Sequence, residues 1–263
     1  MRAAIFQCAA GGLDLDARLE RLREAVIASQ PDPDNRIELV LCPELFASGY
    51  NVGDALRTGA SDPRGVLFDR FAELAQSLNT AIVYGYPERG DGCLYNAAAF
   101  VSADGELLAN HRKRLNSPGS FEGDYFTPGE QATRLNYRGI EIALLICYEV
   151  EFPEAVRNAA VDGAQLVLVP TALVDQWGVV AERVVPARAF ENGLWLAYAN
   201  HAGHENGFDY LGGSRIVAPD GRIEASAGSG EELISALIDT ARVEAAQTRL
   251  PYLRDFRRYR HNV

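Results

Sequence analysis

The chain has 263 residues, of which 48% are hydrophobic and 23% are charged, and its formal net charge at pH 7 is -11. These proportions are typical of a globular protein with a substantial core, and the length fits one α/β domain spanning 1–263. The acidic balance argues against nucleic acid or an anionic membrane as a partner, because both require clustered basic charge.

The start of the chain and its cysteines indicate a cellular compartment. Residues 3–8 already form a strand-like run, without the apolar region and cleavage site of a signal peptide. No stretch approaches the roughly 18 to 20 apolar residues of a membrane span. The cysteines, Cys8, Cys42, Cys93 and Cys147, include no C-x-x-C pair, and no glycine-rich stretch matches a nucleotide-binding fingerprint. We therefore predict a cytoplasmic protein with free thiols, no metal and no nucleotide cofactor.

Short apolar runs rich in branched residues alternate with amphipathic segments, which predicts strands and helices in alternation. In chain order we predict a strand at 3–8, a helix at 13–29, a strand at 37–42, a helix at 62–78, strands at 81–86, 95–101 and 140–146, a helix at 153–161, a strand at 165–169, a helix at 179–192, and strands at 194–200 and 233–238. Turn residues at 103–105 and 219–221 predict one hairpin in each half, over 99–108 and 214–225. This recurrence indicates two layers with similar halves.

Glu44 follows the apolar strand at 37–42, at the edge where α/β proteins place their reactive groups. Its neighbours Leu45 and Phe46 are apolar, and such surroundings raise the pKa of a carboxyl group. A raised pKa suits a general acid and base, so Glu44 is a candidate for proton transfer. The alternative is a loop carboxylate in water.

Lys113 is the one lysine among 25 Lys and Arg residues, and it lies between Arg112 and Arg114. A lysine ammonium is a compact point charge on a flexible stem, whereas a guanidinium is a planar fork. The lone lysine therefore indicates a position that needs an ammonium. The alternative is the chance survival of one lysine in a chain whose other basic side chains became arginine.

Cys147 follows the strand at 140–146 and precedes Pro153, a favourable first residue for a helix. A thiol at a strand-to-helix turn lies near the positive end of the helix, which lowers its pKa below about 8.5. We therefore predict a nucleophile with a lowered pKa, and the alternative is a buried structural cysteine. Because no histidine belongs to a recognisable Cys/His signature, Glu44 and Lys113 are its candidate partners.

Three segments contain these candidate residues: in order, they are Leu41-Cys42-Pro43-Glu44-Leu45-Phe46, His111-Arg112-Lys113 and Leu145-Ile146-Cys147-Tyr148-Glu149. With them the chain resembles the nitrilase superfamily of carbon-nitrogen hydrolases. The similarity extends over nearly the whole chain, through 49–51, 84–88, 126–129, 152–154 and 217–221. A further glutamate of the family maps onto Glu122, shortly before Phe126-Thr127-Pro128-Gly129.

The resemblance implies an α-β-β-α sandwich that pairs into a dimer or larger assembly and uses no metal or organic cofactor. It implies an amidase whose partner is a small-molecule amide, hydrolysed to acid and ammonia through a thioester. Cys147 would attack the amide carbon, and Lys113 and the backbone N–H of Tyr148 would stabilise the oxyanion. Glu44 would transfer protons, and Glu122 would hold Lys113 and the substrate.

The segments 147–154, 186–192 and 198–203 most resemble the branch that contains 5-aminopentanamidase and stereoselective aliphatic amidases. Superfamily members that act on carbamoylated amino acids are expected to carry arginine after the nucleophile, whereas this chain has Glu149 and Glu151. A carboxylate here repels an acidic substrate and favours a neutral or cationic one, although Glu151 could instead cap the following helix.

Further candidates for substrate binding are Trp177, Asn200, Glu205 and Asp209. The last two belong to a polar loop at 201–210, which could bind an amine or lie solvated on the surface. Besides an amidase, the same residues suit a nitrilase or an N-carbamoyl amine amidohydrolase, and a third hypothesis is a non-catalytic protein that keeps the fold.

We also predict a homodimer or higher homo-oligomer, with the C-terminal tail at 251–263 at the subunit interface. The tail departs from the family pattern at Phe256, where an arginine is common. Light scattering that shows a monomer at micromolar concentration would refute the dimer.

Overall fold

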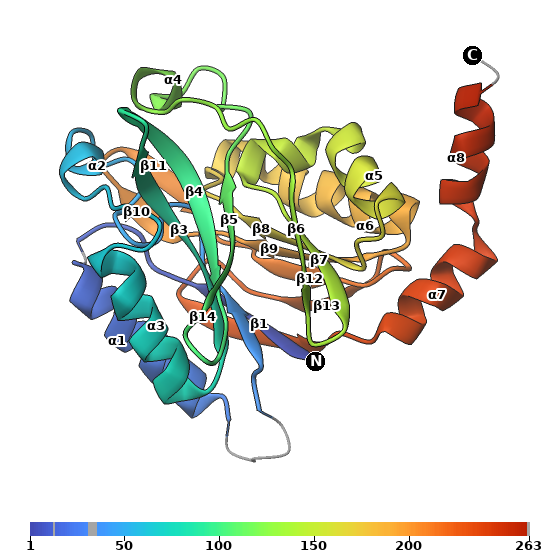
Figure 1. Cartoon of the computed structure of the whole chain (residues 1–263), viewed down its shortest axis with the longest axis horizontal. Coiled ribbons are helices and arrows are strands. Elements are labelled where there is room, and N and C mark those ends of the chain that lie inside the picture. The colour runs from blue at the N-terminus through green and yellow to red at the C-terminus, as the bar shows by residue number, and fades with distance from the viewer. Residues whose placement is uncertain (13, 31–35, 262–263) are drawn as a thin grey trace.

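The computed structural model describes residues 1–12, 14–30 and 36–261, and Figure 1 shows two β-sheets packed between helices. The first sheet has the order β14–β1–β2–β3–β4–β5. Its strands are β14 (Glu232–Leu237), β1 (Arg2–Gln7), β2 (Leu39–Leu41), β3 (Ala81–Gly90), β4 (Cys93–Val101) and β5 (Leu107–Arg112). The second sheet has the order β13–β12–β9–β8–β7–β6. Its strands are β13 (Ile223–Ser226), β12 (Arg215–Val217), β9 (Trp195–Ala199), β8 (Leu166–Pro170), β7 (Ile140–Leu144) and β6 (Thr133–Tyr137).

The two sheets are built alike. In the first, β1, β2 and β3 run parallel and β3, β4 and β5 continue as antiparallel neighbours. In the second, β7, β8 and β9 run parallel, and β12 and β13 form an antiparallel pair. Both predicted hairpins and the predicted similarity of the two halves are therefore confirmed.

Apolar side chains on both faces of each sheet create four layers. Between the sheets, Ile5 and Val83 of the first pack in one core with Leu144 and Leu168 of the second. Because side chains alternate along a strand, the other face of each sheet is also apolar and needs a cover of helices.

The first sheet is covered by α1 (Leu15–Ala28) and α3 (Val66–Leu78), whose Leu22 and Phe71 share a core with Val40. The second is covered by α5 (Pro153–Val161) and α6 (Val185–Asn192), whose Val156 and Ala189 share a core with Val167. The arrangement is the α-β-β-α sandwich that the resemblance implied (Figure 1).

The remaining elements include several that the sequence pattern did not predict. They are α2 (Ala55–Thr58), α4 (Glu122–Tyr125), η2 (Cys147–Glu151), η3 (Asp175–Trp177), η4 (Val180–Val184), β10 (Ala202–Glu205), β11 (Phe208–Leu211), α7 (Thr240–Arg249) and α8 (Tyr252–His261). The expected polar loop at 201–210 is the hairpin β10–β11, and the expected helix at 179–192 begins with the π-helical turn η4. Leu13, where the first helix was expected to begin, lies outside the described residues, and Asp14 caps that helix by accepting the Ala17 N–H.

The C-terminal helix α8 packs against α5 and α6 of its own chain. The Tyr252 ring meets Phe190 edge-on, and the Arg157 guanidinium lies 5.5 Å from the centroid of Phe256, the residue that departs from the family pattern. The expected subunit contact of the tail, whose last residues 262–263 lie outside the described part, stays a prediction, as does the homodimer. Within that described part, no helix is both long enough and apolar enough to cross a membrane.

Candidate active site

The backbone around Glu44 is shaped by a close approach to the neighbouring strand. The chain leaves β2 at Leu41 and reaches Leu45 with φ at 49°, a left-handed conformation that is uncommon outside glycine. A Cβ atom on Gly85 of β3 would lie 2.3 Å from the Leu45 nitrogen, so only glycine leaves room there. Gly85 therefore allows the Glu44 side chain to be presented at the end of β2.

Glu44, Lys113 and Glu122 form a buried cluster that we call the open cluster. The Lys113 ammonium, directly after β5, donates to Glu44 Oε1 at 2.8 Å and to Glu122 Oε1 at 2.7 Å. It also donates to Ser117 Oγ at 3.1 Å, while Asn96 Nδ2 donates to Glu44 Oε1 at 2.7 Å. Glu44 Oε2 is buried and has no hydrogen-bond partner among the described residues. The open cluster thus holds two carboxylates, one ammonium and one unused oxygen.

Tyr50 holds the Glu122 carboxylate of the open cluster in place. Its hydroxyl donates to Glu122 Oε1 at 2.5 Å, and the Ser117 N–H donates to Glu122 Oε2 at 3.1 Å. Burial, together with the charges of Glu44 and Glu122, keeps the pKa of Tyr50 well above its ordinary value, so the hydroxyl stays a donor. Glu122 is consequently held by three donors, the third being Lys113.

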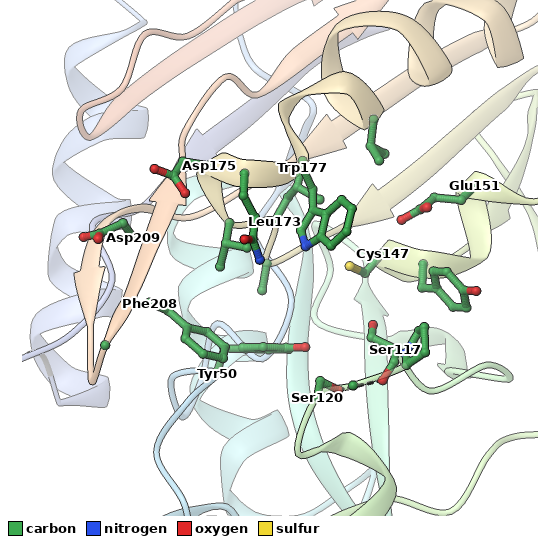
Figure 2. A pocket seen from close by; sticks show the side chains of 18 residues that line it. Tyr50, Ser117, Ser120, Cys147, Glu151, Leu173, Asp175, Trp177, Phe208 and Asp209 are labelled. Carbon is green, nitrogen blue, oxygen red and sulfur yellow. Dashed lines mark hydrogen bonds between the residues drawn. The ribbon is translucent and has the colours of Figure 1, made fainter.

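Cys147 is the first residue of η2 and has φ at 48°. A left-handed non-glycine residue of this kind persists only where the surroundings enforce it. Figure 2 shows its sulfur directed into a cavity. Tyr148 is the second residue of η2. A backbone N–H in the first turn of a helix has no acceptor within that helix. The Cys147 thiol and the Tyr148 N–H are therefore adjacent at the cavity wall.

The prediction of a lowered pKa for Cys147 is wrong. Burial, the first cause, and the nearby Glu44 and Glu122 carboxylates raise its pKa to about 12, although Lys113 acts in the opposite direction. The sequence argument considered only the end of the following helix and not the carboxylates that distant segments bring to the thiol. At neutral pH the thiol keeps its proton.

The expected raised pKa of Glu44 is confirmed. Burial raises it and Glu122 adds to the effect, while Lys113 and Asn96 lower it in part. Glu122 is also buried, but Lys113 and the donors Tyr50 and Ser117 bring its pKa below the ordinary value. The pKa values of the two carboxylates that share the Lys113 ammonium are thus shifted in opposite directions. This difference favours Glu44 as the carboxylate that takes up a proton.

The cavity of about 490 Å³ brings together part of the predicted substrate-binding set. Among its lining residues are Cys147, Tyr148, Glu151, Trp177 and Asp209. In Figure 2 the carboxylate of Glu151 and the indole of Trp177 lie on the same side of the cavity as Cys147, with Asp209 farther away on β11. Burial raises the pKa of Glu151, and no helix-capping bond of a side chain is present at the start of α5.

Glu149, Asn200 and Glu205 do not line the cavity. A 3₁₀ turn has three residues per turn, so Tyr148 and Glu151 share a face and Glu149 points elsewhere. Asn200 bonds to both the N–H and the C=O of Leu173, and Glu205 accepts from Tyr50 and neighbouring donors. All three side chains are buried and bonded within the protein, in place of the substrate contacts predicted for them.

Two residues that support Glu44 escaped the sequence analysis. Asn96 bonds the carboxylate, and His201 Nε2 lies 2.7 Å from the backbone carbonyl of Glu44. Burial lowers the pKa of His201 to about 4, so the ring is neutral and Nε2–H is the donor. A polar Asn96 before the run Ala97-Ala98-Ala99 in a buried strand was the available signal for the first. Among the described residues, no three His, Cys, Asp or Glu side chains are grouped as ligands for a metal ion.

Comparison with known proteins gives this arrangement a family. The chain belongs to the carbon-nitrogen hydrolase family, whose family model matches residues 2–248. It is an amidase of the nitrilase superfamily. It is 41% identical, over 98% of this chain and 89% of the relative, to a hydrolase encoded in the pqqF 5' region of Pseudomonas protegens. It is 31% identical to an (R)-stereoselective amidase of a Pseudomonas species, over 98% and 92% of the two chains.

Solved structures are similar to this chain over its whole length. An amidase from Nesterenkonia sp. AN1 is 35% identical and superposes with a TM-score of 0.85, covering 100% of this chain and 95% of that one. That structure is a glutamate-to-glutamine variant with the acetamide moiety of fluoroacetamide added covalently at the active-site cysteine. A cysteine-to-alanine variant of the same amidase holds butyramide, with a TM-score of 0.84 and coverage of 100% and 96%.

Proposed function

We propose that the chain hydrolyses a small neutral or cationic amide to a carboxylic acid and ammonia, with Cys147 as the nucleophile and Glu44 as the proton-transfer group. The observation that carries this proposal is the open cluster, in which the one lysine of the chain bonds Glu44 and Glu122 beside the cysteine-lined cavity. The covalent adduct at the cysteine of the Nesterenkonia amidase supports the same chemistry.

The protonation states set the order of events. Because the pKa of Cys147 is about 12, the thiol is protonated before attack, and a base has to remove its proton as the C–S bond forms. Glu44 Oε2 has no other partner, and its raised pKa makes it a competent acceptor. The C–N bond then breaks as Glu44 returns the proton to the leaving nitrogen. In the second half, a water molecule gives a proton to Glu44 as its oxygen attacks the thioester carbon, and Glu44 passes that proton to the Cys147 sulfur as the C–S bond breaks.

Lys113 supplies the positive charge that the tetrahedral intermediate needs. Burial alone would lower its pKa, but Glu44, Cys147 and Glu122 together raise it, so the ammonium persists. The oxyanion would be held by this ammonium and by the Tyr148 N–H, and each such donor contributes about 3 to 4 kcal/mol in related chemistry. Glu122, fixed by Tyr50 and Ser117, keeps Lys113 in place.

The cavity wall supports the choice of substrate class. Glu151 borders the cavity, and its side chain has no hydrogen bond in the described structure. The charge of Arg188 lowers the pKa of Glu151 in part, but Arg188 donates to the backbone carbonyls of Val150 and Glu151 and does not line the cavity. The indole of Trp177 offers an apolar surface for a short acyl chain. A neutral or amine-bearing amide therefore fits this wall better than a carboxylate.

Ammonia release from a panel of small amides, nitriles and N-carbamoyl amines tests the proposal. We expect turnover of amides, loss of it in Cys147→Ala, and no loss in Cys93→Ala, which removes another free cysteine that lies outside the cavity. Turnover of nitriles in place of amides would identify a nitrilase. Release of carbon dioxide together with ammonia would identify an N-carbamoyl amine amidohydrolase. Full amide turnover by Cys147→Ala would eliminate the mechanism.

A further inference from the structure

A second buried cluster joins the two halves of the site, and we call it the clasp: Glu149, His111 and Arg114. Glu149 Oε2 lies 2.8 Å from His111 Nε2, and Glu149 Oε1 accepts from Arg114 Nε at 2.9 Å. His111 belongs to β5 of the first sheet, whereas Glu149 belongs to η2, which follows β7 of the second. The partners of Glu149 thus flank Lys113 in the sequence, two positions before it and one after it.

The same carboxylate also fixes the backbone of the nucleophile. The Ile146 N–H donates to Glu149 Oε2 at 2.8 Å, so the peptide just before Cys147 is anchored by a side chain two residues beyond it. Cys147 has the left-handed φ of 48°, which the surrounding structure has to maintain. Glu149 therefore holds the turn in this conformation and attaches it to the strand end that carries Lys113.

His111 is held on both sides. A carboxylate only accepts hydrogen bonds, so the His111 ring carries a proton on Nε2 where it faces Glu149. Its Nδ1 lies 3.0 Å from Thr133 Oγ1 on β6, a strand beside β7. His111, Glu149 and the Ile146 N–H are all buried, so water does not compete for these bonds.

We propose that Glu149 is a positioning residue of the amidase reaction, which holds Cys147 in register with Lys113 across the two sheets. Donors within the protein reach both of its oxygens, so it acts through these two residues and not on the substrate. Reacting groups need alignment, and a shift of about 1 Å can cost about 100-fold in rate. The inference rests on the proposed roles of Cys147 and Lys113.

Glu88 provides a matched control within the same chain. It is as fully buried as Glu149 and also pairs with the segment around Lys113, since Arg112 Nε donates to Glu88 Oε1 at 2.8 Å. Asn110 Nδ2 donates to its other oxygen at 2.6 Å. Glu88 lies on β3, lines no part of the cavity and has no bond to η2 in the described structure. It reproduces the loss of a buried carboxylate without touching the nucleophile turn.

The test compares Glu149→Gln with Glu88→Gln in the full chain. We would measure kcat and KM for an amide that the wild type hydrolyses, thermal stability, and the alkylation rate of Cys147 by iodoacetamide, followed by peptide mass spectrometry. Mapping to the peptide is needed because Cys93 is only partly buried. We expect kcat and the alkylation rate to fall about 10- to 100-fold in Glu149→Gln, with KM within about threefold. In Glu88→Gln both rates should stay within about threefold of wild type.

The sign of the alkylation result separates geometry from charge. Loss of a negative charge near Cys147 favours the thiolate, so electrostatics alone predicts faster alkylation in Glu149→Gln. Slower alkylation would therefore report a displaced nucleophile. Equal losses of rate in the two variants would overturn the proposal and leave Glu149 as a structural ion pair.

Two further variants keep every outcome informative. If Glu149→Gln fails to fold, Arg114→Gln carries the test, because the Arg114 side chain is partly exposed and its loss removes one of the bonds that attach Glu149 to the segment around Lys113. Alkylation of Arg114→Gln at the wild-type rate would then overturn the proposal. Cys147→Ala distinguishes the two levels of inference: activity in that variant removes the proposed function, whereas its inactivity beside an unaffected Glu149→Gln removes only the positioning role.

Discussion

Two buried glutamates bond to residues at the end of β5, Glu44 in the open cluster and Glu149 in the clasp, and their pKa values are shifted in opposite directions. Both are fully buried, but Glu44 has one oxygen without a partner whereas donors reach both oxygens of Glu149. Burial and Glu122 raise the pKa of Glu44. Burial acts in the same direction on Glu149, but His111, the Ile146 N–H and Arg114 outweigh it and lower its pKa.

The difference teaches which feature marks a reactive carboxylate in this fold. Burial is common to both residues, so it does not distinguish them. What distinguishes Glu44 is an incomplete set of donors and a second carboxylate that shares its lysine. An acid with an unused oxygen can receive a proton and release it again, whereas a fully bonded acid stays ionised and immobile.

Lys113→Arg is the largest test of this comparison, because it keeps the charge of the open cluster and changes only its shape. A guanidinium is planar and wider than an ammonium, so it cannot contact Glu44, Glu122 and an oxyanion at one point. We expect a folded protein that has lost nearly all turnover, about 100- to 1000-fold or more, in line with the loss of one oxyanion donor. Steady-state ammonia release and circular dichroism would measure the two properties.

Arg114→Lys is the matching change in the clasp, where charge is also kept and shape is altered. Its side chain is partly exposed, and the clasp retains His111 and the Ile146 N–H as donors. We expect an effect on turnover much smaller than that of Lys113→Arg. Near-normal activity in Lys113→Arg would mean that the single lysine of the chain is a coincidence of composition. The sequence argument that selected Lys113 would then fail.

Most of the fold could be predicted from the sequence, and so could Glu44, Lys113 and Cys147, which the structure brings close together, because each shows a local sequence pattern. Apolar runs marked the parallel strands, and Glu44, Lys113 and Cys147 were marked by a strand end, by composition and by a strand-to-helix turn. β6 was not predicted because its alternate residues are exposed, which leaves a weak apolar pattern in 133–137.

The direction of side chains in η2 could not be predicted in the same way. The sequence shows Glu149 and Glu151 close to Cys147, but only the 3₁₀ turn places one toward the clasp and the other toward the cavity. The pKa of Cys147 also depends on Glu44 and Glu122, which a linear argument about the following helix does not include. The geometry of a local turn decided the first point, and contacts between distant segments decided the second.

The pH dependence of stability separates the two glutamates. Because its folded pKa is lowered, Glu149 stabilises the fold above its ordinary value of 4.5, and this contribution is lost as pH falls through the folded pKa. Because its folded pKa is raised, Glu44 destabilises the fold at pH 7, and this cost disappears as pH falls. We expect Glu149→Gln to lose about 3 kcal/mol of unfolding free energy at pH 7 and less under acid conditions.

Glu44→Gln should by contrast be at least as stable as wild type at pH 7, since Lys113 keeps Glu122 as a partner, while its turnover falls about 100-fold or more. Urea unfolding at pH 7 and pH 5 would measure both variants. If Glu44→Gln proved less stable than Glu149→Gln, Glu44 could no longer be assigned as the glutamate that destabilises the fold at pH 7 and takes up the proton.

Glu151→Gln gives the smallest expected effect and extends the comparison to the substrate. Glu151 resembles Glu44 in having a raised pKa. Unlike Glu44, its side chain has no hydrogen bond in the described structure, is only half-buried and borders the cavity. An attraction to a substrate ammonium is screened at such a site and is worth about 1 kcal/mol. We expect the preference of kcat/KM for an amine-bearing amide over its uncharged analogue to fall about fivefold in Glu151→Gln. Glu154→Gln, a change at an exposed position of α5 outside the cavity, should leave the preference intact. An equal fall in both variants would show that the preference depends on the overall charge of the protein and not on contact with Glu151.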